Sequence, residues 1–170
     1  LFLNLQSNEY STDGVETVYA SNNTYVGKTV VKAGVLEVNT VEHSLGAVAA
    51  NIEVELVGGN LKVNDTSTLA KLSLTGAGGA IDTAGSTVTV GSILGGGSAK
   101  LQKKGSGTLV LNGVNAYKGD TTISEGKVQI KDEKSLGESA AKLILDGGTL
   151  QVIASTNLVK DTTITTNNGT

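Results

Sequence analysis

The sequence predicts an all-β fold, and within that class a parallel β-helix in which short strands stack coil upon coil. Three observations lead to this prediction: part of the chain is repeated, apolar residues alternate in short runs, and small and β-branched residues dominate the apolar content. Repetition at a long period is typical of solenoids, in which each coil buries its inner face against the next. With about 20 to 25 residues per coil, we expect about seven or eight coils, cut from a longer rod.

The internal repeat has two copies, residues 22–63 and residues 115–152. The first part of each copy is offset by 92 positions, which is the separation of Tyr25 and Tyr117. Later matches keep their order, and the offset drifts by only three positions. We therefore expect residues 1–170 to form a single β-helix segment.

Short runs of alternating or β-rich residues predict the strands in order. The runs are residues 29–31, 35–38, 52–56, 60–63, 71–74, 87–90, 108–111, 121–123, 127–130 and 142–145. Gly, Asn, Asp or Ser separates nearly every pair of runs, which is typical of tight turns. Because successive side chains of a strand point to opposite faces, we expect Leu36, Val38, Val128 and Ile130 to point inward.

Helix signals are weak, and two other all-β folds fit less well. Residues 43–50 and 138–142 each have room for one turn, which is too short for a stable helix, so we expect loops that project from a coil. A β-sandwich has longer strands and more aromatic residues in its core. A transmembrane barrel needs strands of about nine to eleven residues and aromatic girdles, whereas this chain has one Phe and four Tyr.

The composition excludes several classes of function. The chain has 23 Gly and no Cys, so disulfides and thiolate metal sites are excluded. The formal net charge is −3, and Lys103-Lys104 is the only basic pair, which leaves no electrostatic footprint for nucleic acid. No run is long enough for a membrane-spanning helix, and the start of the chain does not resemble a signal peptide.

An ordered series of motifs resembles the β-strand repeat of bacterial autotransporter passenger domains. Gly-Gly-x-Ile-Asp-Thr stands at residues 78–83, and Lys-x-Gly-x-Gly-Thr-Leu-x-Leu-x-Gly follows at residues 103–113. Asn-x-Tyr-x-Gly-x-Thr at residues 115–121 and a Gly turn before Val-x-Ile at residues 126–130 complete the series. One such motif is weak evidence, but the whole series in this order is a specific resemblance.

The first copy departs from this pattern. At the offset where Lys-x-Gly-x-Gly-Thr-Leu belongs, the sequence has Glu-Thr-Val-Tyr at residues 16–19. Residues 1–14 carry no match, and they form either a degenerate coil or a loop. The resemblance therefore covers residues 22–63 and 76–152.

The resemblance implies a right-handed parallel β-helix, exported by type V secretion to the bacterial cell surface or released. The implied function is a structural stalk segment that displays an adhesive or self-associating surface and assists its own secretion by folding. The implied partners are a host-cell surface or another copy of the chain, and a C-terminal outer-membrane β-barrel of the same precursor. No nucleic acid, cofactor or metal is expected.

The repeat motif assigns structural roles to a set of turn and strand residues. These are Tyr25, Gly27, Thr29, Gly34, Gly59, Gly105, Gly107, Leu109, Leu111, Gly113, Tyr117, Gly119, Thr121, Gly126 and Gly148. We expect the corner glycines to adopt positive φ, because Gly has no Cβ that would clash in this conformation. The threonines suit a pleated, half-buried surface. Each tyrosine ring is expected to cover a corner while its hydroxyl reaches water.

Candidate catalytic groups are few, and we expect no enzyme. His43, the only His, lacks a Gly-x-Ser-x-Gly turn to partner it, and Lys134 replaces it in the second copy, so we expect a surface histidine. Glu53 and Glu55 alternate with apolar residues, which predicts a solvated strand face rather than the acid pair of a glycosidase. Residues 95–97 are three glycines without the Gly-Lys-Ser/Thr ending of a phosphate loop, so we expect a turn.

Two classes of function remain open. The first is the adhesive or self-associating stalk. The second is part of a secreted effector, such as a toxin or host-cell ligand, that acts through a projecting loop. The candidate loops are residues 7–14, 40–50 and 132–141, because binding residues gather on loops that a rigid scaffold positions.

Overall fold

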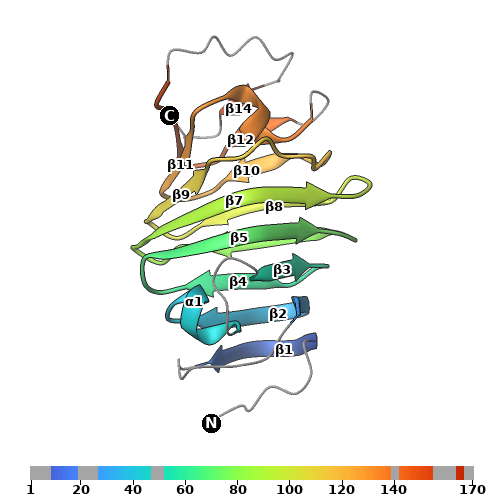
Figure 1. Cartoon of the computed structure of the whole chain (residues 1–170). Coiled ribbons are helices and arrows are strands. Elements are labelled where there is room, and N and C mark those ends of the chain that lie inside the picture. Colours follow the sequence, from blue (N-terminus) through green and yellow to red (C-terminus); the bar gives the residue numbers. More distant parts are fainter. Residues whose placement is uncertain (1–8, 19–26, 47–51, 139–141, 155–163, 167–170) are drawn as a thin grey trace.

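The computed structural model describes residues 9–18, 27–46, 52–138, 142–154 and 164–166. Within them the chain winds as a β-solenoid whose coils stack along one axis (Figure 1). Every strand pairing in the sheet is parallel. The predicted parallel β-helix is therefore confirmed.

Fourteen strands and two short helical turns make up the described chain. The strands are β1 (Glu9–Val18), β2 (Thr29–Val38), β3 (Glu53–Leu56), β4 (Asn60–Val63), β5 (Ser67–Leu74), β6 (Gly78–Asp82), β7 (Thr87–Gly95), β8 (Lys100–Lys104), β9 (Thr108–Leu111), β10 (Thr121–Ile123), β11 (Lys127–Ile130), β12 (Leu143–Leu145), β13 (Thr149–Val152) and β14 (Ile164–Thr166). The helical turns are α1 (Val41–Ser44) and η2 (Glu133–Leu136). About five complete turns lie within the described residues, slightly fewer than the seven or eight expected.

The strands stack into three faces. Face 1 carries the first halves of β1 and β2, then β3, then the second halves of β5 and β7. Face 2 carries the second halves of β1 and β2, then β4, β6, β8, β10, β12 and β14. Face 3 carries the first halves of β5 and β7, then β9, β11 and β13.

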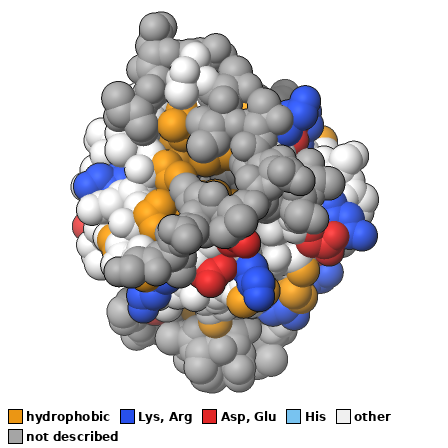
Figure 2. Space-filling view, turned by 90° about the horizontal axis from the view of Figure 1, so that it is seen from above, with side chains coloured by type: hydrophobic (Ala, Val, Ile, Leu, Met, Phe, Trp, Pro, Cys, Tyr) orange, Lys and Arg blue, Asp and Glu red, His pale blue; other side chains and the backbone are white. Residues whose placement is uncertain are grey.

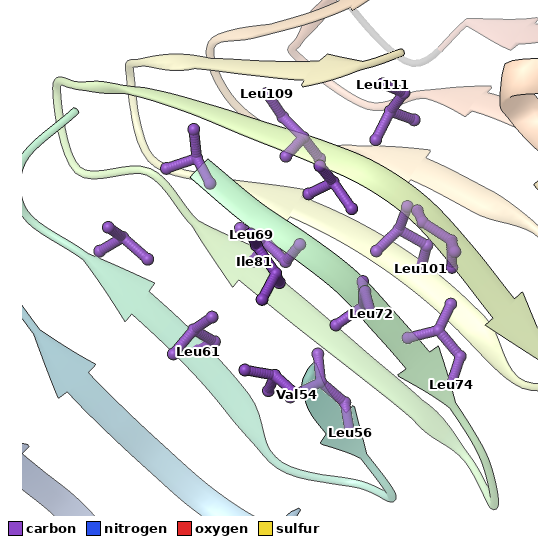
Figure 3. Close-up of a cluster of buried hydrophobic side chains, with 14 of the residues drawn as sticks. Val54, Leu56, Leu61, Leu69, Leu72, Leu74, Ile81, Leu101, Leu109 and Leu111 are labelled. Atoms are coloured by element: carbon purple, nitrogen blue, oxygen red, sulfur yellow. The ribbon is translucent and has the colours of Figure 1, made fainter. Parts of the chain in front are cut away.

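The core is a set of aliphatic ladders that run along the axis of the rod (Figure 3). On face 3, the register places Leu69, Val90, Leu111 and Ile130 directly above one another, each at most 1% exposed. Each coil thus buries its inner side chains only when the next coil docks, as in other solenoids. The inward positions predicted for Leu36, Val38, Val128 and Ile130 are confirmed, since all four are buried.

Some strands extend beyond the predicted runs. Four strands, β1, β2, β5 and β7, continue through a corner and contribute to two faces each. β6 begins with two glycines, and β8 contains three lysines among its five residues, so neither shows a strong strand signal in sequence. Their partners on face 2 determine their conformation, because strand preference depends on the neighbours that a side chain meets.

The N-terminal region resolves one open alternative. Residues 9–18 form β1, which pairs in parallel with β2, so this part is a coil rather than a loop. Residues 1–8 lie outside the described residues.

The prediction of a projecting loop at residues 43–50 was wrong for the first residues of that range. Val41–Ser44 form α1, and Val41, Ser44 and Leu45 are all buried. The backbone N–H of Val41 donates to Ser67 Oγ at 3.1 Å, so α1 packs at the start of face 3 instead of projecting. Among the residues that the structure describes, no helix has the length and apolar character needed to span a membrane.

Candidate functional site

The two carboxylates considered for acid–base chemistry are held in ion pairs on face 1. Lys71 Nζ lies 3.0 Å from Glu53 Oε2, and Lys28 pairs with Glu55. Burial opposes ionisation of Glu53, but hydrogen bonds from Lys71 and a neighbouring serine hold its pKa below the ordinary value. Hydrogen bonds from Lys28 and a threonine likewise hold the pKa of Glu55 low. A catalytic acid requires a raised pKa, so this pair lacks the electrostatics of a general acid.

The other chemical candidates do not come together in the described part of the chain. His43 lies in α1, but its side chain is outside the described residues. Lys134 lies in η2, where its backbone N–H bonds to Asp132 Oδ1 at 2.8 Å. Of residues 95–97, Gly95 is the last residue of β7, and Gly96 and Gly97 lie in the turn between β7 and β8. Within the described ranges, no three His, Cys, Asp or Glu residues are grouped as metal ligands.

The Asn-x-Tyr-x-Gly-x-Thr motif of the second copy is a clamp between coils. Asn115 is 4% exposed, and its Oδ1 accepts a hydrogen bond from the backbone N–H of Ile93 at 2.7 Å. Its Nδ2 donates to the backbone oxygen of Ser135 at 2.5 Å. Ile93 belongs to the preceding coil and Ser135 to the following one. One buried amide therefore ties three successive coils together.

Tyr117 lies inside the rod, which corrects the prediction that its hydroxyl reaches water. The residue is fully buried, and its hydroxyl is 2.5 Å from Thr121 Oγ1. Burial raises the pKa of this phenol well above its ordinary range, although the bond to Thr121 opposes the shift. A Cβ at Gly95 would lie 2.5 Å from Tyr117 Cβ, and one at Gly137 would lie 3.1 Å from the ring. Glycine at both positions therefore leaves room for Tyr117.

The threonines of the motif are more deeply buried than expected. Thr29 and Thr121 are 0% and 1% exposed, so they line the interior instead of a half-buried surface. Thr121 satisfies its hydroxyl through Tyr117. Tyr25, the equivalent of Tyr117 in the first copy, lies outside the described residues.

The glycines of the motif serve two different purposes. Gly126 has φ 62 and makes the expected left-handed corner; Gly27, Gly34 and Gly105 also have positive φ. Gly119 does not, and a Cβ there would lie 2.2 Å from the backbone oxygen of Ala99. The same close approach of a neighbouring coil explains the other motif glycines without positive φ. They are Gly59, Gly107, Gly113 and Gly148. The prediction of positive φ was therefore wrong for Gly59, Gly119 and Gly148, where glycine is needed because a neighbouring coil lies too close for a Cβ.

The three outer faces differ in charge. Faces 1 and 2 carry ion pairs, and on face 2 the register places Glu37, Lys62, Asp82 and Lys104 in one column of alternating sign. Lys62 Nζ lies 3.1 Å from Glu37 Oε1. Face 3 is almost uncharged, with Lys127 as the single charge among its outward positions from β7 to β13. These positions are Thr87, Thr89, Thr108, Val110, Lys127, Gln129, Thr149 and Gln151.

Figure 2 shows one end of the rod, where apolar side chains gather near the middle of the view and again at its lower right. Lys, Asp and Glu side chains lie below the middle and toward the sides of the same view. The described parts of two candidate loops belong to the rod instead of projecting from it. α1 packs on the core, and η2 buries Ser135 and Leu136. Residues 47–50 and 139–141 lie outside the described residues.

One functional candidate was not recognised from the sequence. Lys103 was notable only as half of a basic pair, yet the residue is fully buried. Its inward position follows from the alternation of β8, in which Leu101 and Lys103 point the same way. The alternation of Leu101-Gln102-Lys103 was therefore a usable signal.

Comparison with known proteins gives two matches. The model of the passenger-associated-transport-repeat matches residues 14–38 and 101–130. Over 132 residues, the chain is 35% identical to the adhesin BmaC autotransporter of Brucella suis biovar 1 (strain 1330). That alignment covers 74% of this chain and 4% of the relative's length. No solved structure matches.

Proposed function

The chain is an autotransporter passenger segment with passenger-associated-transport repeats, and from this premise we propose that it forms an adhesive stalk on the bacterial exterior. The class places the segment at the cell surface or in the secreted fraction. The curated relative is named an adhesin, and the chain spans 4% of its length. Adhesion by this segment itself is therefore the proposal.

Face 3 is the surface that best supports the proposal. Its outward positions between β7 and β13 carry one charge, whereas faces 1 and 2 carry ion pairs and an alternating column. The centres of protein interfaces are depleted in charge. Gln129 Nε2 donates to Gln151 Oε1 at 3.4 Å, so these two amides form a polar pair that runs along the axis. Because each coil adds the same kind of strip, weak contacts accumulate along a longer rod.

The proposed partners are a host-cell surface or a second copy of the chain, together with a C-terminal outer-membrane β-barrel of the same precursor. Threonine hydroxyls and glutamine amides both donate and accept hydrogen bonds, so face 3 suits an uncharged polar partner, including a copy of itself. The proposal includes no catalytic activity, because Glu53 and Glu55 are engaged in ion pairs.

We also propose that folding of the segment assists its secretion. Each coil gains its buried contacts only when it docks on its neighbour, so stability grows from coil to coil. A chain that emerges at the cell surface can fold from its leading end, and the folded coils then hinder backward movement. The clamp made by Asn115 supports this sequence of events, because it joins three successive coils.

The adhesive role is tested by charging face 3 in the full-length parent protein. Val110→Glu with Gln129→Glu places two carboxylates on face 3, and Gln102→Glu with Thr122→Glu places two at matched outward positions on face 2. With display measured by surface antibody staining, we expect the face 3 variant to lose most cell binding and autoaggregation. The face 2 variant should keep both. Equal adhesion by the two variants at equal display contradicts the proposal and favours an effector loop.

A further inference from the structure

Lys103 occupies a position where every neighbour along the axis is aliphatic. On face 2 the register stacks it between Ile81 and Ile123, with Leu61 and Leu145 beyond them. Lys103 is 0% exposed, and it is the only charged residue among the fully buried ones of the described chain. Burying an ammonium group in such a ladder is costly unless its donors are satisfied.

The ammonium group satisfies its donors with backbone oxygens at the corner between faces 2 and 3. Lys103 Nζ donates to the carbonyl oxygens of Lys104 at 2.7 Å and Gly105 at 2.6 Å. A third bond reaches the carbonyl oxygen of Glu125 at 3.3 Å. A lysine ammonium has three N–H donors, so all three have an acceptor. Because Glu125 precedes β11, the group links its own coil to the next one.

The charged groups around this amine do not offset its burial. Asp82 faces it from the end of β6 and Glu125 from the turn before β11, while β10 contributes the apolar Ile123. Asp82 Oδ1 already accepts a hydrogen bond from the backbone N–H of Ala84 at 2.8 Å. Burial therefore dominates and lowers the pKa of Lys103 to about 8, against the attraction of the two carboxylates.

We propose that Lys103 is a proton-controlled latch between two successive coils of the rod. The charged amine holds carbonyl oxygens of both coils at a cost in lost hydration. When the ammonium releases its proton to solvent in mildly alkaline solution, that cost disappears and the docked coils gain stability relative to the unfolded chain. The rod is thus more easily opened at this junction at neutral pH than at mildly alkaline pH.

The direction in which stability changes with pH follows from the number of protons that the folded and the unfolded chain bind. An unfolded lysine titrates at the ordinary value of 10.5, whereas the folded group titrates at about 8. Between these values the unfolded chain binds one proton more, so stability rises with pH. Tyr117 has the opposite effect on stability above about pH 10. Its phenol ionises more readily in the unfolded chain than in the folded one, so stability there falls as pH rises. The informative window therefore ends near pH 9.5.

Urea unfolding followed by circular dichroism tests the latch. Between about pH 7 and about pH 9.5, the unfolding constant of the chain should fall by roughly 30-fold relative to that of Lys103→Met, which has no proton to release. Lys104→Met is the matched control, since this adjacent side chain points outward and should leave the effect unchanged. If Lys103→Met shows the same pH dependence as the unaltered chain, the latch does not exist.

A second measurement uses the unaltered protein and stands even where Lys103→Met fails to fold. In protein labelled with ¹³C-lysine, one Cε resonance should titrate with a midpoint near 8, and that resonance should be missing from Lys103→Met. The absence of any lysine resonance with a midpoint near 8 overturns the proposal. The latch depends on the fold alone, so this result is independent of whether the segment is adhesive.

Discussion

At the scale of single residues, one corner column shows how closely the backbone constrains side-chain choice. Gly105, Gly126 and Gly147 have positive φ at steps of 21 residues, and Ala84 stands one step earlier with φ 49. Ala84 is the only described non-glycine residue with positive φ. The backbone N–H of Ala84 donates a hydrogen bond to Asp82 Oδ1, and this bond supports the left-handed conformation of the alanine. The alanine retains strain that the glycines of later coils avoid.

Ala84→Gly should therefore stabilise the chain. Relief of the left-handed strain contributes about 1 kcal/mol, less the added entropy of glycine in the unfolded chain. The midpoint of urea unfolding should shift upward. Ala99→Gly is the control, because Ala99 is buried without positive φ and its loss should destabilise. A decrease in stability for both variants contradicts the strain argument.

Asn115→Ala should be among the more damaging polar substitutions. It leaves the N–H of Ile93 and the carbonyl of Ser135 without their partner in a buried site, at a cost of about 2 to 4 kcal/mol. Asn112→Ala, an exposed asparagine near the end of the same coil, should change stability by less than about 0.5 kcal/mol. Equal effects of the two changes in urea unfolding would show that Asn115 is not a clamp.

At the scale of elements, the short strands have little stability of their own and depend on the strands above and below. β9 is four residues long and alternates in burial, so neighbouring positions of one strand have opposite roles. Leu111 is fully buried in the ladder between Val90 and Ile130, whereas Val110 points outward on face 3. Adjacent residues therefore provide a matched pair for testing folding-assisted export.

Leu111→Asp in the full-length parent should strongly reduce surface display. A buried carboxylate without a partner opposes docking of the coil, so the proposed folding outside the membrane stalls. Val110→Asp, with the same change of charge one residue earlier, should be displayed at the normal level. Antibody staining of intact cells, compared with total protein, measures the difference. Normal display of Leu111→Asp would refute the proposed link between folding and export.

At the scale of the whole molecule, the rod is quasi-one-dimensional, so its stability is a sum over coils and their junctions. The N-terminal coils hold a group of ionised carboxylates whose pKa values lie below the ordinary value. The pKa of Glu37 is lowered by hydrogen bonds from Asn64 and Lys62. Desolvation raises the pKa of Glu53, but its bonds to a lysine and a hydroxyl group together outweigh that effect. The pKa of Glu55 is lowered by hydrogen bonds from a lysine and a threonine. Each group favours the folded state only while it is ionised.

Acid should therefore weaken this end of the rod. Because the folded pKa values lie below the unfolded value of 4.5, the stabilisation is present above about pH 4.5 and is lost as pH falls through the folded values. Hydrogen exchange should show faster opening of β2 to β4 than of β9 to β11 below pH 4.5. Lys62→Met should remove part of this acid sensitivity. Uniform protection along the rod at low pH would contradict the prediction.

Much of the fold could be predicted from short stretches of the sequence, because strand alternation and turn residues are evident over a few positions. Alternation places Leu36 and Ile130 inside, and this needs only the period of a strand. The repeat implies stacking, since a coil that recurs must bury the same face each time. These local and periodic signals determined the all-β class, the parallel solenoid and the family resemblance.

The tertiary structure alone decided the environments of Lys103, Asn115 and Tyr117. Each of these side chains meets partners about 20 residues away in the chain, on the coils before and after its own. Gly119 likewise is required by the backbone of Ala99, not by its own φ. A sequence specifies which face of a strand points inward, because that depends on neighbours in the chain. What the inward group meets depends on how the coils register, and only the stacked rod determines that.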